Sequence, residues 1–127
     1  MKTLSIRQPW SWLIVNGYKD VENRDWHRKI RGEILIHASK FIDHDGYRFV
    51  KESFPEIYPL IPPPDKIERG GIVGKATIVD CVTKWGSLWF RGKYGFVFDV
   101  EQSTPLPFMP LSGQLGFFIA AYEAPNG

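Results

Sequence analysis

Apolar and polar positions alternate in several short stretches of the chain. Residues 33–39 alternate cleanly, with Ile34, Ile36 and Ala38 on one side of an extended backbone, and this period predicts a strand. Residues 72–82 are rich in Val, Ile and Thr and predict the strongest strand. The remaining strands are expected at residues 4–6, 94–100 and 115–122.

Two short segments have the spacing of a helix. Pro9 suits a first helical turn and Gly17 suits a left-handed end, so about nine residues between them are expected to be helical. Asp43 or Asp45 can cap a second helix by accepting backbone hydrogen bonds. The apolar face of that helix would consist of Tyr47, Val50 and Phe54.

Three further segments complete the pattern. Segment 18–26 carries charges at alternate positions in places, which favours an extended conformation. Segment 55–71 contains five prolines and is expected to be a rigid surface loop. Segment 102–122 is uncharged over 21 residues, but its prolines and glycines predict two buried strands and a turn rather than a membrane helix.

These elements predict an α+β fold that is mainly β. We expect one domain over residues 1–127: a small β-barrel, mixed but mostly antiparallel, flanked by short helices. The aromatic content of 15%, with 12 glycines and 10 prolines, argues against a helical bundle.

Cysteine and charge narrow the functional classes. Cys81 is the single cysteine, so neither an internal disulfide nor a structural zinc site is expected, and the start lacks the apolar stretch of a signal peptide. A cytoplasmic location follows as an expectation.

Residues 1–51 carry ten Lys or Arg against six Asp or Glu, and the rest of the chain carries six against eight. A basic first half is compatible with a nucleic-acid-facing surface and equally with ordinary scatter of surface charge.

The most specific motifs lie in the first 39 residues. They are Gln8-Pro9-Trp10, then Gly17, Lys19, Glu22, Arg24 and Trp26 in a G-x-K-x-x-E-x-R-x-W arrangement, then Arg31-Gly32 and His37-Ala38-Ser39. With these motifs the chain closely resembles the ASCH domain family, the activating-signal-cointegrator homology domain. Weaker matches at residues 70–74, 94–98 and 110–117 extend the resemblance over nearly the whole chain. The resemblance implies a PUA-like fold, a small barrel whose helices flank a cleft.

The resemblance also suggests several activities. ASCH relatives are linked to RNA or DNA contacts, to transcription coactivation and, in one branch, to hydrolysis of N4-acetylcytidine. In that branch the Lys of this segment is taken to activate a Thr three residues later. Lys19 matches the Lys, but Glu22 stands where the Thr nucleophile would be. A carboxylate at this position could instead orient a water molecule.

Lys19, Glu22 and Arg24 form the sharpest candidate group. Residues 22 and 24 of an extended segment project to one side, so an ion pair is expected between Glu22 and Arg24. Lys19 and Glu22 could act as general acid and base if burial in a cleft shifted their pKa values. The alternative is a structural ion pair at the mouth of the barrel.

Other residues are candidate ligands for RNA or a nucleoside. Trp26 could stack on a base, and His37 with Ser39 could relay a proton or bind phosphate, or His37 could simply be hydrogen-bonded in a polar pocket. The full binding set is Gln8, Arg24, Trp26, Arg28, Lys29, His37, Ser39 and Lys40. Neither a metal nor a cofactor is expected, because His27 and His44 lack partners at ligand spacing.

The leading hypothesis is therefore a protein that binds single-stranded RNA or a modified nucleoside in a polar cleft, with DNA as a possible ligand and no membrane partner. The first alternative is a hydrolase, resembling either an N4-acetylcytidine amidohydrolase or a ribonuclease, that uses Lys19 and Glu22. The second is a non-enzymatic interaction module like a transcription coactivator.

Overall fold

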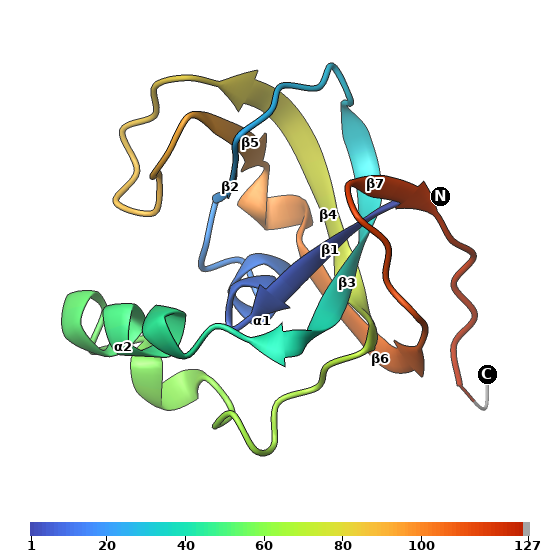
Figure 1. The fold of residues 1–127 in the computed structure, drawn as a ribbon, viewed down its shortest axis with the longest axis horizontal. Coiled ribbons are helices and arrows are strands. Elements are labelled where there is room, and N and C mark those ends of the chain that lie inside the picture. The colour runs from blue at the N-terminus through green and yellow to red at the C-terminus, as the bar shows by residue number, and fades with distance from the viewer. Residues whose placement is uncertain (126–127) are drawn as a thin grey trace.

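Seven strands form one mixed sheet in the computed structural model, which describes residues 1–125. The strand order is β2-β5-β4-β3-β1-β7, and β6 pairs with β4 beside this path (Figure 1). β1 and β3 run parallel, and the other neighbours run antiparallel. The strands are β1 (Lys2–Gln8), β2 (Val21–Arg24), β3 (Gly32–Ile42), β4 (Gly71–Val82), β5 (Tyr94–Phe98), β6 (Thr104–Pro110) and β7 (Phe117–Ile119). The mainly β class predicted from the sequence is confirmed.

The sheet remains open between its first and last strands. β2 and β7 stand at the two ends of the order, and within residues 1–125 no backbone ladder joins them. Side chains cross the gap instead. Arg24 Nη2 donates a hydrogen bond of 2.9 Å to the backbone oxygen of Ser5 in β1, and Trp26 packs on Phe117 of β7 with ring centroids 5.8 Å apart. The barrel expected from the sequence is thus not closed: the two ends of the sheet are joined by side chains of Arg24 and Trp26 rather than by a backbone ladder.

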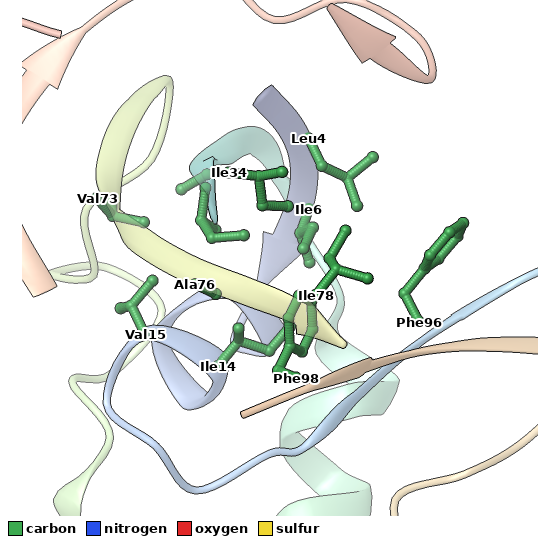
Figure 2. Close-up of a cluster of buried hydrophobic side chains, with 12 residues drawn as sticks. Leu4, Ile6, Ile14, Val15, Ile34, Val73, Ala76, Ile78, Phe96 and Phe98 are labelled. Atoms are coloured by element: carbon green, nitrogen blue, oxygen red, sulfur yellow. The ribbon is translucent and has the colours of Figure 1, made fainter. Parts of the chain in front are cut away.

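The main core fills the inside of this curved sheet. Figure 2 shows its side chains converging from β1, β3, β4, β5 and the first helix, α1 (Trp10–Val15). β3 is buried on both faces: Ile34 and Ile36 belong to this core, whereas Leu35 packs with Ile72 and Phe118 on the other side. The alternation in residues 33–39 correctly predicted the strand, and its central place in the sheet explains why both faces are covered.

The helices lie close to their predicted positions. Asp43 caps α2 (His44–Ser53) by accepting a hydrogen bond of 2.8 Å from the backbone nitrogen of Gly46. Gly17 follows α1 with a φ of 80°, as its predicted left-handed role requires, although α1 has six residues rather than about nine. Within residues 1–125 no helix is long and apolar enough to cross a membrane.

The proline-rich segment packs against α2. It contains the 3-10 turn η1 (Tyr58–Leu60), and a second such turn, η2 (Val100–Gln102), follows β5. Tyr47 Oη of α2 donates a hydrogen bond of 2.7 Å to the backbone oxygen of Pro62, and Ile61 is buried. The predicted surface loop is therefore anchored to the core by its own apolar residues.

Candidate functional site

A cleft with two connected lobes opens beside β2, the first strand of the sheet order, on the side that faces β1 and the β6–β7 loop. The first, which we call the aromatic lobe, has a volume of about 300 Å³ and lies among the start of α1, β2, the start of α2 and the β4–β5 loop. The second, the arginine lobe, has a volume of about 680 Å³ and lies among β1, β2, the end of β3 and the β6–β7 loop. Four residues line both lobes and make them continuous: Trp10, Glu22, Asn23 and Asp43.

Three rings form the apolar wall of the aromatic lobe. The ring centroids of Trp10, Phe49 and Trp89 lie 6.2 to 6.5 Å from one another. Phe54 stacks on Trp89 at 3.8 Å, and Asp43 Oδ2 accepts a hydrogen bond of 2.9 Å from Trp10 Nε1. These contacts hold the rings in place, so the wall exists before any ligand arrives.

An ion-pair chain forms the polar side of the same lobe. Lys19 is only 2% exposed, donates a short hydrogen bond to the backbone oxygen of Val21, and holds its Nζ 3.6 Å from Glu22 Oε1. The other carboxylate oxygen, Glu22 Oε2, accepts a hydrogen bond of 3.0 Å from Arg24 Nε. The ion pair predicted between Glu22 and Arg24 is confirmed.

The electrostatics of Lys19 follow from this burial. Removal from water lowers the pKa of the Lys19 ammonium, and the Glu22 carboxylate opposes that shift. The charged form of Lys19 is thus stabilised by one close counterion, the Glu22 carboxylate. Such a group in a cleft can donate a hydrogen bond or, in its neutral form, accept a proton.

Asn23 positions the loop that carries Trp89. Its Nδ2 donates a hydrogen bond of 3.0 Å to the backbone oxygen of Trp89, and its Oδ1 accepts one of 2.8 Å from the backbone nitrogen of Arg91. Arg91 in turn lies 4.0 Å from the ring centroid of Phe49. Both functional groups of the Asn23 side chain therefore hold the wall in place.

The comparison with known proteins fits this architecture. The model of the ASCH domain matches residues 4–101. This chain belongs to the ASCH domain family. It is 27% identical over 117 residues to activating signal cointegrator 1 of Homo sapiens, and 30% identical over 89 residues to the Mus musculus protein of the same name. These alignments cover 84% and 64% of this chain, but the chain spans only 18% and 14% of those relatives.

Solved structures support the fold. A crystal structure of a point mutant of the ASCH protein from Zymomonas mobilis matches with a TM-score of 0.52 and covers 87% of this chain and 75% of that chain. A crystal structure of ASCH from the same organism matches with a TM-score of 0.50, covering 87% and 73%. Both are 16% identical in sequence to this chain, so they show a shared fold.

The ASCH domain brings part of the predicted site together. Lys19 and Glu22 line the aromatic lobe, and Arg24 and Ser39 line the arginine lobe. Gln8 lies elsewhere: its Nε2 donates a hydrogen bond of 2.8 Å to the backbone oxygen of Glu68, and its Oε1 accepts one from the backbone nitrogen of Trp12. Gln8 therefore fixes the start of α1 rather than facing either lobe.

His37 lies behind the arginine lobe. Its Nε2 is 2.6 Å from the backbone oxygen of Leu111, and its Nδ1 is 2.8 Å from Ser5 Oγ. Because a carbonyl oxygen can only accept, Nε2 carries a hydrogen and donates it. His37 is buried and ties the β6–β7 loop to the sheet, which matches the expected polar pocket better than a proton relay open to the cleft.

Besides Gln8 and His37, four predicted ligands lie outside both lobes. Trp26 packs on Phe96 and Phe117 in the main core, and the Arg28 guanidinium lies 4.5 Å from the centroid of the Trp26 ring. Lys29 and Lys40 are exposed and line neither lobe. Among residues 1–125, no three His, Cys, Asp or Glu side chains gather closely enough to hold a metal ion.

The sequence prediction missed most of the aromatic wall and its supports. Trp10 belongs to the Gln8-Pro9-Trp10 motif but was not among the predicted ligands. Asp43 was predicted as a helix cap, and its second hydrogen bond, to Trp10, had no local signal. The other missed lining residues of this lobe are Asn23, Gly46, Phe49 and Arg91.

Proposed function

We propose that this ASCH domain binds single-stranded RNA, or a modified nucleoside, by taking one base into the aromatic lobe. The observation that carries the proposal is the pairing of a three-ring wall with a buried Lys19–Glu22 pair around one cavity of about 300 Å³. A base has flat apolar faces and polar edges, so it can stack on aromatic rings while its edge meets polar groups. A volume of this size is at the lower end of the range for small-ligand sites.

The polar groups of the aromatic lobe can form hydrogen bonds with the edge of a base. A protonated Lys19 has three donors, of which one serves Val21 and another faces Glu22. One donor is thus available for a carbonyl oxygen or ring nitrogen of a base. Glu22 retains lone pairs that can accept from an exocyclic amino group. A cytoplasmic location is part of this proposal, in keeping with the single cysteine.

Titration with unstructured single-stranded RNA, followed by tryptophan fluorescence at low and moderate ionic strength, tests the proposal. Lys19→Met should weaken binding by about tenfold or more, because a hydrogen bond from a charged group is lost. Lys40→Met, the same substitution on an exposed lysine outside both lobes, should change the affinity by less than about twofold. A parallel titration with single-stranded DNA of the same sequence shows whether the 2′-hydroxyl of the ribose contributes to the affinity.

Two results would count against the proposal. Absence of salt-dependent binding at low ionic strength would exclude the RNA ligand. Equal losses in Lys19→Met and Lys40→Met would exclude the aromatic lobe as the place of binding. Urea unfolding of both variants must accompany the titration, so that a loss of binding is not mistaken for a loss of folded protein.

The position of Lys19 favours one second candidate, hydrolysis of a modified base or of RNA. Burial lowers the pKa of Lys19 inside a cavity, and a neutral amine can take a proton from water as the water attacks an acyl carbon. With N4-acetylcytidine the new bond joins water oxygen to the acyl carbon, the C–N bond breaks, and the proton passes to the leaving amine, giving cytidine and acetate. Incubation with N4-acetylcytidine and with RNA tests this, and turnover that survives Lys19→Met contradicts the role of Lys19.

A third candidate rests on the name of the mammalian relatives. These relatives carry the name activating signal cointegrator 1, and a module that contacts another protein would share the fold without using the lobes. This candidate is favoured if RNA, nucleoside and hydrolysis assays are all negative.

A further inference from the structure

We infer that the arginine lobe is a second nucleotide subsite, so that the cleft binds a strand of at least two nucleotides rather than a free nucleoside. This inference rests on the proposed uptake of a base by the aromatic lobe. The two lobes share four lining residues, Glu22 and Asn23 of β2 among them. A strand with one base in the aromatic lobe can therefore continue into the arginine lobe, which at about 680 Å³ is the larger of the two.

Two arginines of the arginine lobe have N–H donors that can bind phosphate oxygens. Arg7 is exposed and lines this lobe, and within residues 1–125 its guanidinium makes neither an ion pair nor a hydrogen bond. Arg24 uses Nε and Nη2 for Glu22 and Ser5, and within the same residues its Nη1 donates no hydrogen bond. Arginine guanidinium groups with free N–H donors are common contacts for phosphate oxygens.

The carboxylates of the lobe are already engaged. The oxygens of Glu22 face Lys19 and Arg24. Those of Asp43 accept hydrogen bonds from Trp10 Nε1 and from the backbone nitrogen of Gly46. Among residues 1–125, Arg7 and Asp43 are the charged lining residues of this lobe without an ion-pair partner, and Asp43 caps the start of α2, so the proposed contact to an anion is made by the exposed Arg7 guanidinium itself.

An exposed aromatic ring supplies a platform for the second base. Phe41, near the end of β3, lines the arginine lobe and is 72% exposed. Leu115, in the β6–β7 loop, lines the same lobe and is 100% exposed. Exposed aromatic rings beside a positively charged groove are the usual arrangement for stacking successive bases of a single strand. The amide of Gln114 lies in the same lining and can meet the edge of that base.

The test compares uridine with oligouridylates of one, two and four nucleotides, by tryptophan fluorescence and calorimetry. Affinity should rise by about tenfold from one nucleotide to two, because a second base stacks. Phe41→Ala should remove this increase and leave mononucleotide binding unchanged. Arg7→Gln should weaken dinucleotide binding and lower the slope of log K against log salt by about one.

Matched controls lie outside the cleft. Leu88→Ala removes a side chain that is 77% exposed, and Arg69→Gln removes an exposed guanidinium; neither residue lines a lobe. Neither variant should alter the increase with length or the salt slope.

The outcomes separate this inference from the proposed function. If the mononucleotide binds and the dinucleotide binds no better, or if Phe41→Ala keeps the full increase, the second subsite is refuted while the aromatic lobe stands. If no uridine ligand and no mixed-sequence RNA binds, the proposed function fails and this inference fails with it. An increase with length that Phe41→Ala abolishes and Arg7→Gln reduces, with a lower salt slope in Arg7→Gln, supports the two-nucleotide cleft.

Discussion

The substitution Glu22→Gln removes the negative charge that pairs with two cations at the cleft, Lys19 and Arg24. The Glu22 carboxylate lies 3.6 Å from Lys19 Nζ and 3.0 Å from Arg24 Nη2. Gln keeps the shape of the side chain but leaves Lys19 buried without this counterion. Removing one partner of a buried ion pair costs about 3–5 kcal/mol. We expect a loss of about 3 kcal/mol at neutral pH, because the Glu22 and Arg24 side chains remain 9% and 23% exposed and water can partly replace the lost contacts.

This loss should become smaller as the pH rises. Burial lowers the pKa of Lys19 in the folded protein below 10.5, and the Glu22 carboxylate limits that shift. Without Glu22 the folded pKa falls further. Between the folded pKa and 10.5 the unfolded chain binds more protons than the folded one, so the free energy of unfolding rises with pH, by up to about 1.4 kcal/mol per unit. The pH range over which the free energy of unfolding rises should be wider in Glu22→Gln. The rise should be absent from the double variant Lys19→Met/Glu22→Gln.

Urea unfolding at about pH 7 and about pH 10 measures both effects. The control is Glu33→Gln, which removes an exposed ion pair with Lys75 at 3.4 Å and should cost less than about 1 kcal/mol. The double variant Lys19→Met/Glu22→Gln should be more stable than Glu22→Gln alone, because the unpaired buried charge is gone. The reasoning is refuted if Glu22→Gln costs no more than Glu33→Gln, or if the double variant is as unstable as Glu22→Gln at both pH values.

Two further substitutions test other parts of the fold. Tyr47→Phe loses the hydrogen bond to Pro62 and should cost about 1 kcal/mol at neutral pH. Burial raises the pKa of Tyr47 from 10.0 to about 12, so stability measured by urea unfolding should fall between these pH values in the native protein and not in Tyr47→Phe; identical alkaline profiles would contradict this. Gly113→Ala would place its Cβ 2.7 Å from His37 Cε1 and should cost about 1–3 kcal/mol. The control is Gly86→Ala, whose new Cβ would have no heavy atom within 4 Å. Equal melting temperatures for Gly113→Ala and Gly86→Ala would contradict the expected loss, because they would show that His37 moves aside without a cost in stability.

Features with a local physical cause could be predicted from the sequence. Asp43 caps α2 because its side chain reaches a backbone nitrogen three residues on. Glu22 and Arg24 pair because residues two apart in a strand project to the same side. The strand at residues 33–39 follows from its alternation. In each case the interacting groups lie within a few residues of one another.

The cleft depends on contacts between distant segments, which periodicity does not encode. Trp10 and Trp89 meet because α1 and the β4–β5 loop come together in the fold. Trp26 stands beside a basic run and was predicted to line the cleft, but it packs on Phe117 from the far end of the chain. Local alternation likewise cannot show whether the first and last strands of a sheet pair, so the sequence could not distinguish the open sheet from a closed barrel.

The open edge of the sheet and the cleft have a common cause. If a backbone ladder joined β2 to the other end of the sheet, the Arg24 bond to Ser5 would be replaced and the space between the two ends would close. Arg24, which crosses this gap, pairs with Glu22, and Glu22 and Lys19 form the polar side of the aromatic lobe, so this pair affects folding and binding together. Variants of this pair therefore need parallel stability measurements. Arg7 and Phe41 are exposed, so their removal should cost little stability, and a loss of binding there reports directly on the cleft.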